Sequence, residues 1–321
     1  MEENKIFNQM KDSLSESYIP LVCYHLKDTD KVHLGNKKDK KCRFCGREHP
    51  EVTFKMVTHA IPEFTGNKIL ISEYECDECN GLFSKMETQM SNYMNMYHTA
   101  AQVHGKKGVP SYKPNSQQGS KIDLGSEVVN IKSIQGETPI INVDEENKTI
   151  TYQGHRSYIP QMVFKCLTKM AMTIMPEKEL KYFSATLDWL QGKFEYDKNL
   201  IVRFRYYPGI RPLPFVSCML FKRKEDALKA AVPYCLFGLA YSNFVFQIHV
   251  PCCENDADLH GKKVDILLIP TPLDFSIETL KLPNNLNFSS NEKVKNEPVS
   301  ISLSYEKLIE VPVDPEKDKI E

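Results

Sequence analysis

The sequence predicts an α+β protein with a small cysteine-framed amino-terminal domain and a larger carboxy-terminal α+β domain that contains a mainly antiparallel sheet. Two CxxC pairs frame residues 42–79. The stretch 105–121 is rich in Gly, Pro, Ser and Gln, which is the composition of a linker. Beyond it, two helical patterns and several apolar segments of strand length follow. With 321 residues, the chain is long enough for both domains.

The linker sets the expected boundaries between the parts. The first domain covers 1–104, with its core over 40–98, and the second covers 122–290. Residues 291–321 are charged and poor in large apolar side chains, so we expect them to form a charged tail outside both cores.

Helices are predicted where apolar residues recur at helical spacing. Ile6, Met10 and Leu14 lie four residues apart, and Pro160 and Pro176 stand where a helix begins and ends. The expected helices cover 4–17, about 80–98, 160–175 and 177–191. The second of these carries a long apolar stripe: Leu82, Phe83, Met86, Met90, Tyr93, Met94 and Tyr97.

Strands are predicted for apolar segments bounded by turn residues. A polar turn over 144–147 separates 139–143 from 148–153, which predicts a hairpin. The other expected extended segments are 18–26, a strand near 128–134, and then 199–207, 214–222, 233–241, 243–250 and 264–269.

Composition and charge exclude several classes of protein. The amino terminus lacks an apolar signal segment, and no run of about 18 apolar residues predicts a membrane span. We therefore expect a cytoplasmic protein without a membrane partner, whose ten cysteines stay reduced. The net charge of −1 gives no global sign of nucleic-acid binding, so any such signal has to be local.

The two CxxC pairs predict a structural zinc site formed by Cys42, Cys45, Cys76 and Cys79. Each pair directs two sulfurs at one ion, and the thirty residues between Cys45 and Cys76 leave room for two strands and a loop. Four unrelated buried thiols are the plainer alternative, and disulfides fit a reducing compartment poorly.

The stretch framed by the cysteines contains a histidine after an apolar segment, His59, and Asn80 follows the last cysteine directly. With Cys42-Arg43-Phe44-Cys45-Gly46, His59 to Asn67, and Cys76-Asp77-Glu78-Cys79-Asn80, residues 40–95 resemble the HNH endonuclease family, in the branch with a four-cysteine zinc site and Asn as the last motif residue. Taken singly, such a histidine is more often structural, and such an asparagine is often a helix cap.

The resemblance implies a ββα-metal fold and metal-dependent hydrolysis of phosphodiester bonds. His59 corresponds to the general base that activates water. Asn80 corresponds to a ligand of a catalytic Mg²⁺ or Mn²⁺ ion. Glu87 lies two helical turns after Asn80, so we expect it on the same face as a second ligand or as the residue that orients one.

The sequence departs from the family pattern in two places. Thr58 stands directly before His59, where many members carry an acidic metal ligand. The middle asparagine of the motif is absent from the segment before Cys76, and Asn67 lies earlier, where its side chain is expected to support the loop. A carboxylate would then complete the metal site, and the candidates are Glu63, Glu73 and Glu75.

A basic stretch over 31–47 predicts contact with the nucleic-acid backbone. Its candidates are Lys37, Lys38, Lys40, Lys41, Arg43 and Arg47. Contacts to phosphates position a protein without reading sequence. A solvated loop is the plainer interpretation of the same residues.

The expected function is thus an HNH endonuclease acting on nucleic acid, in particular double-stranded DNA. The domain over 122–290 would bind a small-molecule or protein activator, as in a bacterial defence or toxin effector, or would bind DNA in a restriction-type enzyme. A homo-oligomer is compatible with either. The alternative is a non-catalytic zinc-ribbon module that binds nucleic acid or protein, which Thr58 favours.

Overall fold

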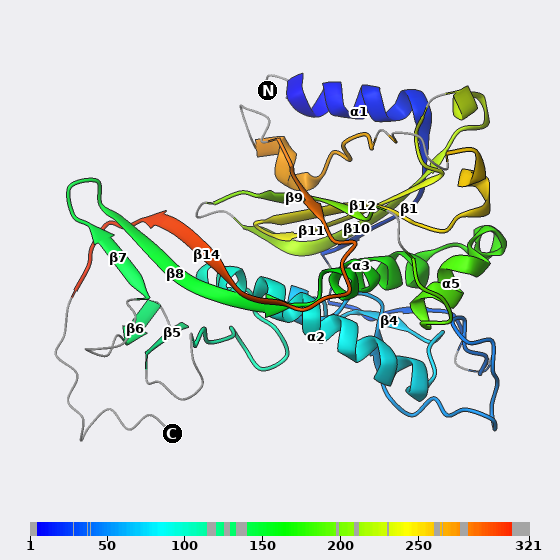
Figure 1. Ribbon diagram of the computed structural model, residues 1–321, viewed down its shortest axis with the longest axis horizontal. Coiled ribbons are helices and arrows are strands. Elements are labelled where there is room, and N and C mark those ends of the chain that lie inside the picture. The colour runs from blue at the N-terminus through cyan, green and yellow to red at the C-terminus, as the bar shows by residue number, and fades with distance from the viewer. Residues whose placement is uncertain are drawn as a thin grey trace.

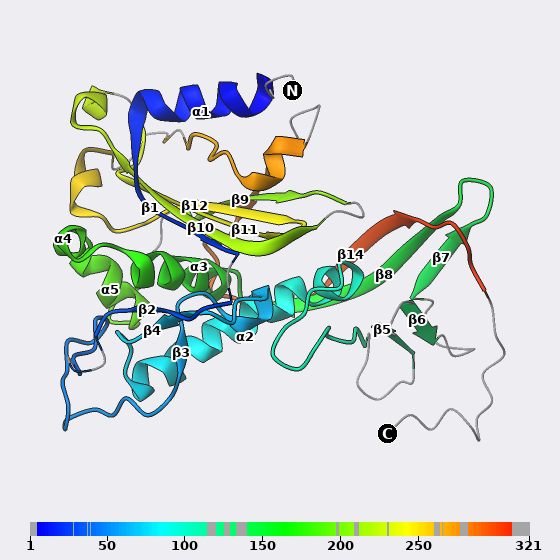
Figure 2. The same cartoon turned by 180° about the vertical axis from the view of Figure 1, so that it is seen from behind.

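The computed structural model places its elements in layers (Figure 1). It describes residues 5–27, 29–36, 38, 40–113, 120–124, 129–132, 140–196, 199–208, 212–229, 231–259, 264, 266–276 and 282–309. Helix α1 (Lys5–Ser17) covers one face of a large sheet, α3 (Pro160–Ile174) and α5 (Ser184–Leu190) lie under the other face, and the cysteine-framed part lies beneath them (Figures 1 and 2). A β-arm extends to one side of these layers.

The large sheet has six antiparallel strands in the order β1-β10-β11-β12-β9-β13. The strands are β1 (Tyr18–Leu26), β9 (Ile201–Tyr206), β10 (Leu213–Arg223), β11 (Cys235–Ser242), β12 (Phe244–His249) and β13 (Asn284–Asn287). Residues on both faces of β11 and β12 are buried, which explains why these strands are almost continuously apolar.

Helices enclose this sheet and join it to the cysteine-framed part. The α-helices are α1 (Lys5–Ser17), α2 (Asp77–Ala100), α3 (Pro160–Ile174), α4 (Glu177–Leu180) and α5 (Ser184–Leu190). Short 3₁₀ helices are η1 (Glu63–Thr65), η2 (Lys181–Phe183), η3 (Glu225–Lys229), η4 (Glu254–Leu259) and η5 (Pro272–Ser276). Helix α3 packs between the sheet and α2, and almost all of its side chains are buried.

The cysteine-framed part contains a small sheet in the order β2-β4-β3, formed by β2 (Val32–Leu34), β3 (Thr58–His59) and β4 (Leu70–Ser72). The pair β2–β4 is parallel and β3–β4 is antiparallel. Strands β3 and β4 followed by α2 form the expected strand–strand–helix unit.

The β-arm packs against the carboxy-terminal half of α2. Its three-stranded sheet has the order β14-β8-β7, with β7 (Ile141–Asp144), β8 (Thr149–Tyr158) and β14 (Val294–Ser304), and a separate hairpin joins β5 (Lys121–Leu124) to β6 (Val129–Lys132). Met96 of α2, Tyr152 of β8 and Ile301 of β14 share one apolar cluster.

The predicted fold class is confirmed: helices and mainly antiparallel sheets are combined, with a cysteine cluster in the amino-terminal part and a larger carboxy-terminal part. The helices expected over 4–17 and 160–175 match α1 and α3, and the expected hairpin matches β7 and β8. The helix expected over 177–191 is interrupted by η2. Among the described helices, none combines the length and the apolar character needed to cross a membrane.

Three segments differ from the expectation. Residues 294–304 of the expected tail form β14, because their alternating apolar side chains pack in the β-arm. Ile266 to Ile269 form no strand. Their backbone bonds the Gln247 side chain in place of a neighbouring strand, since the Gln247 amide donates to Leu267 O and accepts from Ile269 N. Strand β13 was not predicted, since its residues are mostly Asn.

The expected division at 105–121 remains a prediction, but two observations tie its sides together. Strand β1, from the first expected domain, pairs with β10 of the second. One apolar core then runs from Cys42 in the cysteine frame to Phe288 beside β13, through α2 and α3. The cysteine-framed part and the large sheet therefore fold around a shared core.

Candidate active site and zinc site

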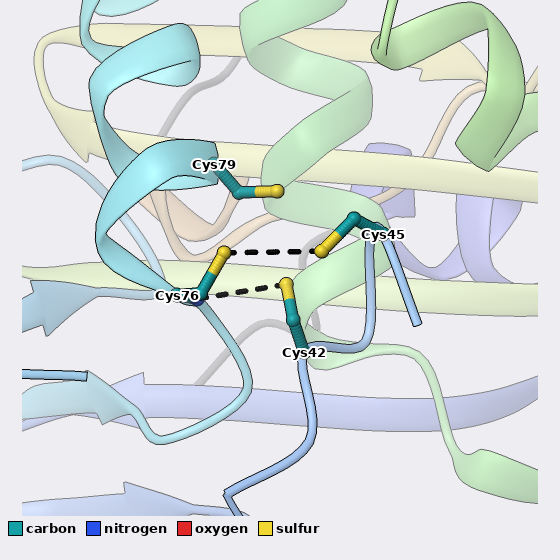
Figure 3. A group of neighbouring side chains, drawn as sticks. All are labelled: Cys42, Cys45, Cys76 and Cys79. Carbon is teal, nitrogen blue, oxygen red and sulfur yellow. Dashed lines mark hydrogen bonds between the residues drawn. The ribbon is translucent and has the colours of Figure 1, made fainter. Parts of the chain in front are cut away.

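The four predicted zinc ligands lie together (Figure 3). Their sulfur atoms are all within 4.8 Å of one another, and the Sγ atoms of Cys45 and Cys76 are 3.8 Å apart. A tetrahedral zinc ion with Zn–S distances of about 2.3 Å requires sulfurs about 3.8 Å apart. The cluster therefore fits a structural zinc ion, and three of its cysteines are buried.

Local hydrogen bonds shape the two cysteine turns. In the first, Gly46 N donates to Cys42 O and Cys42 N donates to Arg47 O, and Gly46 has the positive φ of 73° that such a turn needs. In the second, Cys76 is the N-cap of α2, and Cys76 N lies 3.5 Å from Cys42 Sγ. The turns thus bring the start of α2 against the first cysteine pair.

Strand β3 ends at His59, which places the ring at the edge of the small sheet. The ring is 17% exposed, and its Nδ1 lies 3.8 Å from Glu63 Oε2. Burial lowers the pKa of His59; Lys169, Lys106 and Lys31 act in the same direction, and Glu63 opposes them. The imidazole is therefore held in its neutral form at neutral pH, with Glu63 beside it.

The loop after His59 is fixed by the buried Asn67 side chain. Its amide donates to Ile61 O and Leu70 O, and its carbonyl accepts from Ile69 N and Leu70 N. These bonds close the loop between β3 and β4 and so hold the position at which His59 leaves the strand.

The residues considered for completing the metal site are placed differently from one another. Thr58 is buried, and its hydroxyl donates to Ser72 O within the small sheet. Glu73 binds His33 of β2 at 2.6 Å. Glu75 is fully buried, and Glu63 lies beside His59. Of the three carboxylates, Glu63 alone contacts the histidine.

Helix α2 carries the two remaining candidates on one face. Asn80 lies in its first turn, and within the described chain its side chain makes no hydrogen bond. Glu87 follows two turns later, with 30% of its side chain exposed. Both offer oxygen ligands, which Mg²⁺ and Mn²⁺ prefer, and Mg²⁺ needs few protein ligands because it keeps several waters. In the described ranges, only the cysteine cluster assembles three or more His, Cys, Asp or Glu side chains around one point.

Lys169 of α3 also reaches this centre, which was not predicted from the sequence. Its ammonium donates to His59 O at 3.2 Å and lies 3.0 Å from Glu75 and 3.8 Å from Glu87. The available signal was composition: Lys165 and Lys169 are the only charged residues in the apolar segment Pro160–Ile174, four residues apart. A charged residue in a buried helix requires a partner.

Arg43, one of the predicted phosphate contacts, has a buried guanidinium, with 3% of the side chain exposed. It donates to the carbonyls of Met172, Thr173 and Met175 at the end of α3, pairs with Glu177, and stacks on Tyr74. Arginine at a helix carboxy terminus satisfies carbonyls that lack partners within the helix. Arg43 therefore connects the first cysteine pair to α3.

The other basic candidates lie at the surface. Lys41 pairs with Glu48 at 2.9 Å, and Arg47 pairs with Glu78 at 2.5 Å. Lys38 and Lys40 are exposed and line an open hollow with Lys41. Lys37 lies outside the described residues. The role of these residues in binding phosphates stays a prediction.

Comparison with known proteins identifies one family. Residues 42–94 match the family model for HNH endonucleases, a span that contains the zinc ligands, His59 and both candidate ligands on α2. The resemblance to this family predicted for residues 40–95 is confirmed over residues 42–94. No curated protein and no solved structure matches the chain.

Proposed function

We propose that this protein is a metal-dependent endonuclease that hydrolyses phosphodiester bonds of double-stranded DNA, with His59 as the general base. The observation that carries the proposal is the position of a half-buried, neutral histidine inside a span that matches HNH endonucleases. The family match by itself supports nuclease activity on nucleic acid. The substrate, the base and the ion are the parts that we propose.

The role of His59 follows from its protonation state. A general base has to be unprotonated when water attacks phosphorus, and a neutral imidazole accepts that proton near neutral pH. Glu63, 3.8 Å from Nδ1, is placed to stabilise the imidazolium that results. Asn67 holds the loop and so keeps the ring in position.

Asn80 and Glu87 would hold a Mg²⁺ or Mn²⁺ ion through their side-chain oxygens. When bound, such an ion stabilises the negative charge that develops on the phosphate and on the leaving oxygen. The zinc ion has a separate role, since four thiolates leave no open position for substrate.

Exposed lysines near the first cysteine pair support binding to a phosphate backbone. Lys38, Lys40 and Lys41 lie on one hollow of the surface, and such contacts are tolerant of sequence. We further propose that the carboxy-terminal part controls the nuclease in response to a ligand or a protein, as a defence or toxin effector requires. Its helix α3 contacts the nuclease centre through Lys169.

A cleavage assay tests the proposal. Zinc-loaded protein is incubated with plasmid DNA and Mg²⁺ or Mn²⁺, beside His59→Ala and Asn80→Ala. We expect both variants to lose at least about 100-fold in rate, the scale of a lost general base. His33→Ala is the matched control, since this exposed histidine pairs with Glu73 on the same small sheet. Cleavage by His59→Ala at the wild-type rate would contradict the assignment of the base.

A non-catalytic zinc-ribbon module is the second candidate, and the placement of Thr58 favours it. The hydroxyl is bound to Ser72 O, so the position that carries a metal ligand in many HNH enzymes is unavailable here. Such a module would bind DNA equally well with and without His59, and it would cut neither plasmid nor single strands with either ion.

A further inference from the structure

The ammonium of Lys169 lies at the centre of the candidate active site. Its side chain is 2% exposed, and it contacts Glu75 at 3.0 Å, Glu87 at 3.8 Å and His59 O at 3.2 Å. Lys169 lies on α3, and α3 packs against α2, the helix that carries Glu87. One cation from the carboxy-terminal part thus contacts two carboxylates of the nuclease-like part.

The charges of this group are incompletely satisfied. The Glu75 carboxylate is fully buried, and neither of its oxygens accepts an aligned hydrogen bond, so the ammonium is its only described counter-charge. Two carboxylates, at 3.0 Å and 3.8 Å, favour the charged form of the Lys169 ammonium. Lys169 therefore stays charged, and it neutralises one of the two carboxylates.

We propose that the Lys169 ammonium is a built-in cation that competes with the divalent metal ion for the Glu87 carboxylate. The inference rests on the proposed metal site at Asn80 and Glu87. A divalent ion at Glu87 would lie within a few ångströms of a buried positive charge, and the repulsion between them is strong where water is scarce. Lys169 thereby weakens metal binding to the free protein, and the negative phosphate of bound DNA offsets this repulsion.

The test measures metal binding directly, with Mn²⁺ as the probe. Electron paramagnetic resonance follows free Mn²⁺ during titration of the zinc-loaded, full-length protein. The key variant is the double substitution Lys169→Met with Glu75→Gln, which removes both charges together. Removing one partner alone would leave a buried unpaired charge and threaten folding, whereas removing both is often tolerated.

We expect the double variant to bind Mn²⁺ at least about tenfold more tightly than the wild type, since the removed cation contacts Glu87 directly at 3.8 Å and its repulsion of the metal ion outweighs the attraction of the Glu75 charge removed with it. Adding Glu87→Gln to it should abolish the gain, because the gain depends on that carboxylate. The matched control is Lys222→Met with Glu179→Gln, a second Lys–Glu pair at 3.0 Å that joins β10 to α4. It should leave Mn²⁺ affinity unchanged, and circular dichroism should show every variant folded.

Two results would overturn the inference, and they differ in meaning. Binding that depends on Glu87 but is equal or weaker in the double variant shows that Lys169 does not compete, and it leaves the proposed function intact. If neither protein binds Mn²⁺ and the wild type cuts no DNA, the inference fails together with the proposed metal dependence.

Discussion

The cysteine cluster and the candidate active site both draw on residues 42–94, but they are assembled in different ways. All four zinc ligands come from two short CxxC turns, and the turns contact each other directly. The candidate active site combines β3 and α2 with Lys169 of α3, which is more distant in the sequence. A local motif therefore suffices for the structural metal, whereas the chemistry of the second site depends on the packing of the carboxy-terminal part.

Helix α3 connects the two sites. Arg43, within the first cysteine pair, satisfies the carbonyls at its end, and Lys169, farther back in the helix, contacts the nuclease centre. A shift of α3 relative to the cysteine frame would therefore move Lys169 relative to Glu87.

The largest effect is expected from Cys76→Ser, which removes a zinc ligand. Structural zinc contributes about 10–16 kcal/mol of apparent binding free energy in zinc-finger peptides, and that energy drives folding. We expect loss of zinc, measured by atomic absorption, and a strong fall in melting temperature. One core spans the cysteine frame and the large sheet, so a single unfolding transition is expected. Cys23→Ser, at an exposed thiol on β1, should change neither zinc content nor stability.

Arg43→Met tests the connection at the end of α3. The variant leaves three buried carbonyls without their donor, which should reduce the free energy of unfolding by about 3 kcal/mol. The urea midpoint measures this change. An unchanged midpoint combined with weaker DNA binding would instead restore Arg43 as a phosphate contact.

The pH dependence of cleavage tests the electrostatics around His59. Protonation removes the base, and burial with three nearby lysines holds the pKa of His59 below its ordinary value of 6.5. The single-turnover rate should therefore keep more than half of its plateau at pH 6.5 and fall only at lower pH. Glu63 raises this pKa, so Glu63→Gln should move the acidic limb further down. A limb centred above pH 7 would contradict this account of the base.

The sequence predicted what short-range patterns determine. The CxxC pairs located the zinc site, and apolar periodicity located α1, α2 and α3. His59 and Asn80 were proposed because a family motif has fixed spacing, and the family match covers both positions. Each of these signals lies within a few turns of helix or one loop.

The contacts missed by sequence reasoning join distant segments. No local sequence pattern around Lys169 predicts its contact with Glu87. Arg43 lies in a basic stretch whose composition predicts phosphate contacts, and only the packing of α3 shows that its side chain bonds helix carbonyls instead. The tail was predicted over 291–321 because this segment is charged and poor in large apolar side chains, yet residues 294–304 become strand β14 by pairing with β8. Only tertiary packing distinguishes these alternatives.

The smallest effect is expected from Lys40→Met, which tests the exposed part of the basic stretch. DNA affinity is measured as a function of salt in the His59→Ala background, so that cleavage does not interfere. Loss of one phosphate contact should weaken binding at every sequence and reduce the salt slope by about 1. Stability should change by less than about 0.5 kcal/mol, because Lys40 is exposed.

Lys11→Met on α1, across the large sheet from the cysteine frame, is the control and should leave the slope unchanged (Figure 2). Equal salt slopes for Lys40→Met and the control would show that DNA binds another face of the protein. The exposed lysines of the basic stretch would then belong to a solvated loop, and Arg43 would differ from them in being buried.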